Sequence, residues 1–318
     1  MLEELYEKLK KHRVRFYPYQ KKRFRDLIEH EFAELGYDDV VVDKAKNVII
    51  GDVHNARIIY TAHYDTPMFS PWFLFARVFG HVLGGLVIGT LLMLLAVGVV
   101  TVMIAGFLEG LVTGEFFMFA DSSYFWISSV IAFALFFIFP SPGNANDNTS
   151  GVLAVYEIAS RLKAYKMEEG IAFVLFNNEE WGLIGSGAFK KEMQGRERIA
   201  RRNGDEVHKF TLINFDCVGI GDRIMLGYAS ANGKRICQGI APSFRYPVDI
   251  KKGNIMTSGS DHLHFKDNGI GIFVSRRSYL GPLHLPMVHN PFNKKIDINI
   301  VKDVCDAILN VGIRVNDE

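Results

Sequence analysis

The sequence has few cysteines and no excess of charge of either sign. Its three cysteines are Cys217, Cys237 and Cys305, and no two of them have the Cys-x-x-Cys spacing of a metal or redox motif. We therefore expect them in the core of a protein from a reducing compartment, not in a disulfide framework. The 36 Lys and Arg residues balance 35 Asp and Glu residues, so no strong field indicates nucleic acid as a partner.

The first residues lack the apolar centre of a secretion signal. Residues 1–11 instead have the charged, amphipathic pattern of a helix. A second helix is predicted over 21–35 and ends at Gly36, and residues 39–43 and 47–50 are typical of a hairpin. On this basis we expect no export of the chain.

Charged residues are absent from two long stretches. Residues 78–108 and 124–139 contain no Asp, Glu, Lys or Arg. Because about twenty apolar residues cross a bilayer, we predict an inserted transmembrane helical hairpin over 71–142, with spans at about 78–108 and 122–140. A buried helical hairpin in a soluble core is the alternative.

The connection between these spans predicts the orientation. Residues 109–121 contain three acids and no Lys or Arg. Because cytoplasmic loops are enriched in Lys and Arg, we expect an integral membrane protein with residues 1–70 and 143–318 in the cytoplasm. Glycines four residues apart would let a second helix approach, and a homo-oligomer through this span stays open; they are Gly80, Gly84, Gly85 and Gly89.

Outside these stretches, apolar strands alternate with helices. Strands are predicted at 57–62, 171–176, 210–215, 223–226 and 271–274, and helices at 152–163, 187–193 and 301–311. This alternation predicts an α/β fold with three layers and a mostly parallel mixed sheet. A strand over 57–62 needs the later strands, so residues 1–70 and 143–318 are expected to form one discontinuous domain, with 71–142 inserted into it.

Polar side chains follow several of these strands. Each has an ordinary structural role open to it, such as a core imidazole, a helix cap or a solvated acid pair. Together they supply the imidazole and carboxylate ligands that suit Zn²⁺. They are His63, Asp65, Asp147, Glu179, Glu180, Asp216 and His289.

Four motifs contain six of these residues, and a fifth follows them in the chain: His63-Tyr-Asp-Thr66, Asn146-Asp-Asn-Thr-Ser-Gly151, Glu179-Glu-Trp-Gly-Leu-Ile-Gly-Ser186, Asn214-Phe-Asp-Cys-Val-Gly219 and Ser260-Asp-His-Leu-His-Phe265. In type and order they resemble the motifs of the M28 family, the co-catalytic zinc aminopeptidases. The resemblance covers roughly residues 20–66 and 143–312. It implies a phosphorylase/hydrolase-like fold and two Zn²⁺ ions, with Co²⁺ or Mn²⁺ also suited to such ligands.

The resemblance also implies a role for each site residue. Asp147 would bridge the two ions. His63 and Asp216 would complete one metal position, and Glu180 and His289 the other. Glu179 would be the general base acting on a metal-activated water, and Asp65 would orient His63. Asp261 and His262 in the fifth motif would contact substrate.

Three features depart from the family pattern. A short loop usually joins the His-x-Asp motif to the bridging Asp, whereas about eighty residues intervene here. The last motif is His289-Asn-Pro-Phe-Asn293, with Asn where an acid is expected, which leaves His284 and His264 as alternative ligands. Many relatives are secreted, and we expect no secretion signal here.

These observations predict a membrane-anchored di-zinc metallopeptidase, an aminopeptidase acting on peptides at the cytoplasmic membrane surface. Asp147 lies about eight residues after the second predicted span and His63 about fifteen before the first. A chain extends at most about 3.5 Å per residue, so the site would lie near the bilayer, and substrates could be hydrophobic or membrane-associated. The alternatives are a glutaminyl-cyclase-like acyltransferase with one zinc and a catalytically inactive membrane scaffold or receptor.

Overall fold

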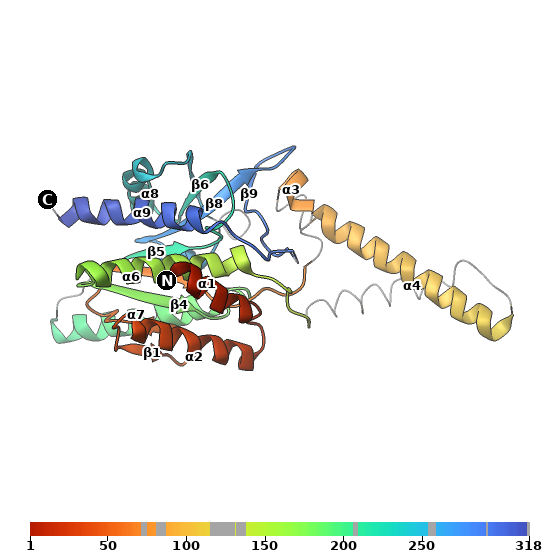
Figure 1. Ribbon diagram of the computed structural model, residues 1–318, viewed down its shortest axis with the longest axis horizontal. Helices are drawn as coiled ribbons and strands as arrows, with labels where there is room; N and C mark the ends of the chain where they lie inside the picture. The colour runs from red at the N-terminus through yellow and green to blue at the C-terminus, as the bar shows by residue number, and fades with distance from the viewer. Residues whose placement is uncertain are drawn as a thin grey trace.

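A mixed sheet of nine strands organises the protein, shown as a computed structural model in Figure 1. The structure describes residues 1–70, 75–80, 87–114, 131, 138–205, 209–253, 259–290 and 292–316. Across the sheet the order is β1-β2-β4-β3-β5-β8-β6-β7, and β9 pairs with β8. The strands are β1 (Val40–Val42), β2 (Val48–Ile50), β3 (Ile58–His63), β4 (Ile171–Phe176), β5 (Thr211–Phe215), β6 (Arg223–Tyr228), β7 (Val248–Lys252), β8 (Gly269–Arg277) and β9 (Leu283–His284).

The four central strands are parallel. β3 lies between β4 and β5, and β5 pairs with β8 in the same direction. β6 and β7 are also parallel, whereas β1–β2, β2–β4, β6–β8 and β8–β9 are antiparallel. The predicted α/β fold with a mixed sheet is confirmed, although its parallel pairs are concentrated at the centre. Because β3 pairs on both sides with strands from beyond residue 143, the two polar regions share this sheet.

Helices cover both faces of the sheet. One face packs against α1 (Leu2–Lys11), α2 (Pro18–Glu34), α6 (Ser150–Tyr165), α8 (Ala231–Ile240) and α9 (Ile298–Asn316). The other packs against α7 (Ile184–Asn203) and the segment that includes the short helix η5 (Asp261–His264). The remaining described helices are α3 (Ala76–Phe79), α4 (Thr90–Thr113), η3 (Ala145–Thr149) and η4 (Ala241–Ser243).

The two faces follow from the alternation of side chains along each strand. Tyr60 and Phe173 point into the core under α2 and α6, and their neighbours Ile59 and Val174 point into the core under α7. The three cysteines are buried and unpaired, as expected of core residues. Sequence periodicity did not predict β7, β9 or α8.

Helix α4 differs from the other helices because its apolar side chains are exposed. Val87–Thr113 is one helical stretch, long and apolar enough to cross a membrane, and 17% of its most apolar window is buried. Its buried residues, Gly98, Val102, Gly106 and Gly110, form one strip. Figure 1 shows α4 projecting away from the sheet. Length and composition alone are weak evidence of a span, because core helices of soluble proteins meet the same criteria.

The structure changes the predicted start of the first span and describes little of the second. The first does not begin at residue 78, because Gly80 ends α3 with a φ of 82°. The described part of the helix that includes α4 runs from Val87 and continues past Glu109. The second, at 122–140, lies mostly outside the described residues, and Pro140 at its end forms a bridge with Met68 instead of a helical turn. One candidate span is therefore found in the described part of the chain, and the two-span hairpin is not shown. Gly84 and Gly85 also lie outside the described residues, and the oligomer stays a prediction.

Candidate metal centre

The carboxyl ends of three neighbouring parallel strands carry most of the predicted site residues. β3 ends at His63, with Asp65 two residues later. Glu179 and Glu180 follow β4, and Asp216 follows β5. Because β3 lies between β4 and β5 in parallel register, these residues meet at one edge of the sheet. The sheet order therefore explains how residues more than a hundred positions apart come together.

His63 faces two carboxylates at this edge. Its Nε2 lies 3.4 Å from Asp147 Oδ1 and 3.7 Å from Asp216 Oδ1. Its Nδ1 lies 3.5 Å from Asp65 Oδ1. Asp65 in turn accepts hydrogen bonds from the backbone N–H groups of Glu179 and Glu180, at 3.0 and 3.3 Å. Asp65 thus links the imidazole to the loop that carries both glutamates.

A second imidazole faces the other oxygen of Asp147. His289 Nε2 lies 3.8 Å from Asp147 Oδ2 and 3.0 Å from Glu180 Oε2. The His289 backbone N–H also donates to Asp147 Oδ2 at 3.4 Å. Asp147 therefore stands between His63 and His289, with one oxygen toward each, which is the geometry expected of a bridging ligand.

The residues present fit a divalent metal of the zinc type. Ligand atoms within 4.8 Å of one another come from His63, Asp147 and Glu180, and from His63, Glu179 and Asp216. Two buried carboxylate oxygens, Glu180 Oε1 and Asp216 Oδ1, have no hydrogen-bond partner within the described structure. Such atoms are costly to bury unless a cation or donor meets them. Imidazole and carboxylate donors together suit zinc.

Cys217 belongs to a third group of close ligand atoms, with Asp147 and Asp216. Burial raises the pKa of its thiol well above the ordinary value, and the neighbouring Asp216 carboxylate adds to the shift. A neutral thiol is a weak metal ligand, because the thiolate is the binding form. The carboxylates and imidazoles are therefore the better donor set.

Burial also changes the protonation of the glutamate pair. It raises the pKa of Glu179 well above its ordinary value; the nearby His63 opposes this shift, and Glu180 adds to it. Burial beside Asp147 raises the pKa of Glu180 to about 7. For His289, burial opposes the charged form, but the Glu180 carboxylate prevails and raises the pKa to about 9. These carboxyls share a site that is short of positive charge.

The two residues predicted to contact substrate lie in η5, which is fully buried at these positions. Asp261 is near enough to Glu179 for their charges to interact, and neither of its carboxylate oxygens has a hydrogen-bond partner within the described structure. The His262 ring instead packs on the sheet, over Gly227 and Gly271 and edge-on to Phe273. Burial lowers its pKa to about 4. Substrate contact by either residue stays a prediction.

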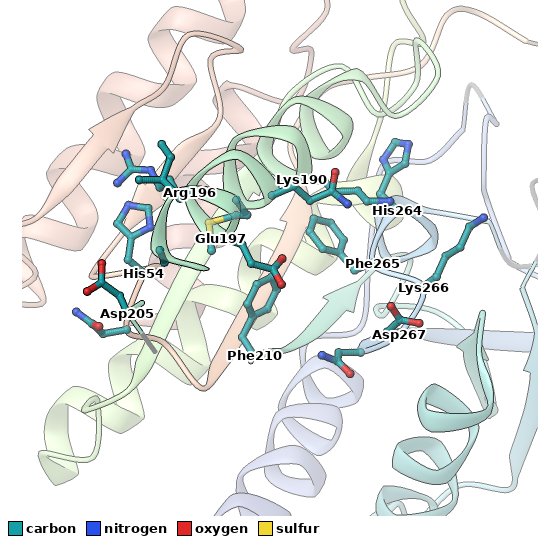
Figure 2. Close-up of a pocket in the computed structure, with 16 residues that line it drawn as sticks. His54, Lys190, Arg196, Glu197, Asp205, Phe210, His264, Phe265, Lys266 and Asp267 are labelled. Carbon is teal, nitrogen blue, oxygen red and sulfur yellow. The ribbon is translucent and has the colours of Figure 1, made fainter. Parts of the chain in front are cut away.

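The alternative ligands lie outside the close groups of ligand atoms found in the described residues. His264 Nδ1 lies 2.9 Å from Ser186 Oγ, and His284 lies in β9. Figure 2 shows that His264 lines a surface cavity instead, beside Lys190 of α7 and Phe265. This cavity has a volume of about 930 Å³, and none of the predicted site residues lines it. The volume of a cavity therefore does not show where the proposed metal ligands lie in this protein.

A buried arginine that sequence reasoning missed joins the two loops on either side of the apolar stretch. Arg15 is fully buried, and its backbone N–H donates to Thr66 Oγ1 at 2.8 Å. Its guanidinium donates through Nε to the Tyr64 carbonyl oxygen and through Nη1 to Thr149 Oγ1 at 3.1 Å. Asn144 completes the network by donating to Thr66 Oγ1 and accepting from Thr149 Oγ1.

This network, here called the Arg15 clamp, consists of Arg15, Thr66, Asn144 and Thr149. It holds the segment after His63 against the segment around Asp147. Burial lowers the pKa of Arg15 to about 9, and the charges of Asp65 and Asp147 oppose this shift. No sequence signal marked Arg15, because it is one cation in a stretch rich in Lys and Arg.

The fold and this cluster place the protein in the class of α/β proteins with a zinc-exopeptidase-like fold. Residues 127–286, half of the chain, match Peptidase family M28, and the chain belongs to that family. The match includes Asp147, Glu179, Glu180 and Asp216, whereas His63, Asp65 and His289 lie outside it. The resemblance inferred from the motifs is thus confirmed at the level of the family.

Solved structures with similar folds come from several bacteria. The LapA aminopeptidase of Legionella pneumophila has a TM-score of 0.59 at 12% identity over 100% of this chain and 71% of its own. A glutaminyl cyclase of Tannerella forsythia has a TM-score of 0.57 at 16% identity over 98% of this chain and 96% of its own. A Zn-dependent exopeptidase of Parabacteroides distasonis has a TM-score of 0.56 at 15% identity over 98% and 97%. At these identities the likeness concerns the fold alone.

Similarity to curated proteins is confined to a short segment. Leucine aminopeptidase 2 of Trichophyton rubrum is 32% identical over 75 residues, which are 23% of this chain. The aligned segment spans 13% of that protein's length. So short a segment does not show that this chain shares the activity of the whole relative.

Proposed function

We propose that the protein is a zinc-dependent aminopeptidase that removes N-terminal residues from peptides. In this proposal Asp147 would be a ligand shared by two zinc ions, with His63 and Asp216 as the further ligands of one and Glu180 and His289 as those of the other. The observation that carries it is Asp147, whose two oxygens face two imidazoles from different loops. The unpartnered oxygens of Glu180 and Asp216 support it. Cobalt or manganese would suit the same donors.

The chain's own residues would share the remaining work. When bound, the zinc ions would supply Lewis-acid chemistry at the peptide carbonyl. Glu179 would take a proton from the attacking water on its carboxylate and pass it to the leaving amine. Asp65, beside Nδ1 of His63, would keep that ring oriented with Nε2 toward Asp147.

Membrane anchoring is the second part of the proposal. The stretch Val87–Thr113 contains 27 residues. At about 1.5 Å per residue it would measure roughly 40 Å, more than the ~30 Å hydrocarbon core of a bilayer. The shortage of Lys and Arg after this helix favours a cytoplasmic catalytic domain. The second span at 122–140 remains part of this proposal, as does a peptide substrate at the membrane surface.

Metal analysis combined with peptide hydrolysis tests the proposed activity. The purified protein should contain close to two zinc ions per chain and cleave peptides with a free amino terminus but not N-acetylated ones. About one zinc per chain, with cyclisation of N-terminal glutamine, would favour the glutaminyl-cyclase-like alternative. That alternative is supported by the similar fold of the Tannerella forsythia enzyme over nearly all of both chains. Metal binding without either reaction would favour a catalytically inactive scaffold.

Replacing Arg15 by Met should weaken zinc binding by about 10–100-fold, the usual effect of losing a group that positions metal ligands. The change removes the donor that ties Thr149 to the Tyr64 carbonyl. Zinc affinity is measured by competition with a chelating dye, after circular dichroism has shown that the variant folds. Thr149→Val, which removes one hydroxyl of the clamp and leaves the bond from Arg15 to the Tyr64 carbonyl, should shift the affinity in the same direction by less. The control is Arg13→Met, at an exposed position on the same segment. Wild-type zinc affinity in both Arg15→Met and Thr149→Val would contradict a positioning role.

A further inference from the structure

Large apolar side chains are exposed on the loops that carry the proposed ligands. Trp181 directly follows Glu180, and its side chain is 46% exposed. Phe292 lies three residues after His289 and is 64% exposed. Soluble proteins rarely gather such residues around a polar site without a partner. We give the name site rim to these two residues together with exposed residues near the two ends of the apolar stretch: Tyr19, Phe139, Trp181, Tyr279, Leu280 and Phe292.

Ring contacts join one side of the site rim into a continuous surface. Trp181 lies 5.6 Å from the Phe16 ring, which lies 5.1 Å from Tyr17. Tyr17 stacks on Tyr19 at 6.1 Å, and its hydroxyl donates to the carbonyl oxygen of Ile138 at 3.0 Å. The rim therefore extends from the glutamate loop to the point where the chain returns from the apolar stretch.

The other side of the site rim meets the start of the apolar stretch. The backbone N–H groups of Tyr279 and Leu280 donate to the carbonyl oxygens of Arg77 and Val78, at 3.1 and 3.0 Å. The guanidinium of Arg77 lies over the Tyr279 ring at 5.1 Å. Both sides of the rim thus adjoin the two ends of the stretch that contains α4, which projects from the same end of the sheet (Figure 1).

The composition of this surface fits the boundary between lipid headgroups and acyl chains. Tyr and Trp are enriched at that boundary because their rings are apolar with one polar group. Exposed cations adjoin the rim at Arg77 and Lys294 and would meet anionic headgroups. The rim is also continuous with α4, whose side chains are exposed along most of its length. A bilayer would cover the rim and α4 together.

We propose that the site rim lies in the headgroup region of a bilayer crossed by α4, so that the site opens toward peptides held at that interface. The inference rests on the proposed aminopeptidase activity and narrows its substrates to peptides with a lipophilic segment behind the free amino terminus. Such peptides are concentrated at the interface by their own apolar residues. They reach His289 and Glu180 without crossing bulk water.

The test compares two substrates and two matched double variants of the full chain in vesicles of phosphatidylcholine and phosphatidylserine. One substrate is a short polar peptide in solution, and the other adds a lipophilic segment that binds the vesicles. The rim variant is Leu280→Ser with Phe292→Ser. The control is Tyr165→Ser with Ile199→Ser, which are as exposed but lie at the end of α6 and on α7, away from the rim.

The rim variant should keep kcat/KM for the polar peptide within about twofold and lose about tenfold for the bound peptide. The control should match the wild type with both substrates. Wild-type kcat/KM for both substrates in the rim variant would overturn the inference while leaving the aminopeptidase proposal intact. Failure of the wild type to cleave either substrate would instead refute the aminopeptidase proposal. A change in oligomeric mass of the rim variant, with bound-peptide cleavage unchanged, would identify a protein as the occupant and also overturn the inference.

Fluorescence provides a second, activity-free measurement. The chain has three tryptophans, so Trp72→Phe with Trp126→Phe leaves Trp181 as the reporter. Lipids brominated near the headgroup should quench this signal more than lipids brominated deep in the acyl chains. Absence of quenching by either lipid would place the rim away from the bilayer and overturn the inference.

Discussion

Glu179→Gln should lower kcat by about 10²–10⁴-fold and leave the metal content of the protein unchanged. Gln has the size and shape of Glu but cannot take up the proton of the attacking water. The backbone N–H of residue 179 would still donate to Asp65, so the loop should keep its position. Turnover is measured with a free-amino-terminus peptide, and metal content by elemental analysis of the same samples.

Two further variants test whether the expected loss of turnover is specific to the general base. Glu197→Gln, at a glutamate of α7 that pairs with Arg201 across one helical turn, should leave turnover unchanged. Glu180→Gln removes a proposed ligand and should lower metal content as well as turnover. Wild-type turnover in Glu179→Gln would refute the role of Glu179 as general base, whatever the metal content.

Removing the metal should lower the melting temperature by about 10 °C and abolish activity. Six carboxyl groups are clustered at the site beside the imidazoles of His63 and His289: Asp65, Asp147, Glu179, Glu180, Asp216 and Asp261. A ligand present at about a thousand times its Kd stabilises the folded state by about 4 kcal/mol. For a domain of this size each kcal/mol shifts the melting temperature by roughly 2–4 °C.

The measurement is a thermal melt before and after chelation, followed by addition of zinc. Zinc should restore both the melting temperature and the activity of the wild type. Asp147→Asn should not recover either, because Asp147 faces both proposed metal positions. Identical melting curves with and without chelator would show that the carboxylates do not need a cation, against the proposed metal centre.

Periodicity located β3, β4 and β5 within one residue at each end. The predicted strands at 57–62 and 171–176 correspond to β3 and β4, because long apolar runs next to turns identify buried strands. β7 and β9 escaped prediction for physical reasons. β7 has charged, half-exposed residues such as Asp249 and Lys251, and β9 consists of two residues, so neither has a distinct apolar pattern.

The sequence predicted the proposed ligands of the candidate site, but not the residues that hold the ligand-bearing segments in place. The motifs led to His63, Asp147 and Glu180, and the structure brings these together as one group of close ligand atoms. The Arg15 clamp could not be predicted, because its members come from three separate segments that meet only in the folded chain. The start of the first span was also misplaced, since hydropathy does not register the turn that Gly80 makes before α4.

The places of the central strands along the chain, the polar residues that follow them and the long uncharged stretch were determined by the sequence alone. They depend on local patterns of side chains that repeat every two or every three to four residues. Only the tertiary structure decided which oxygen of Asp147 faces which imidazole, that Arg15 is buried behind them, and that exposed aromatic residues lie on the loops that carry the proposed ligands. Those are contacts between distant segments, and chain-local patterns carry no information about which segments will meet.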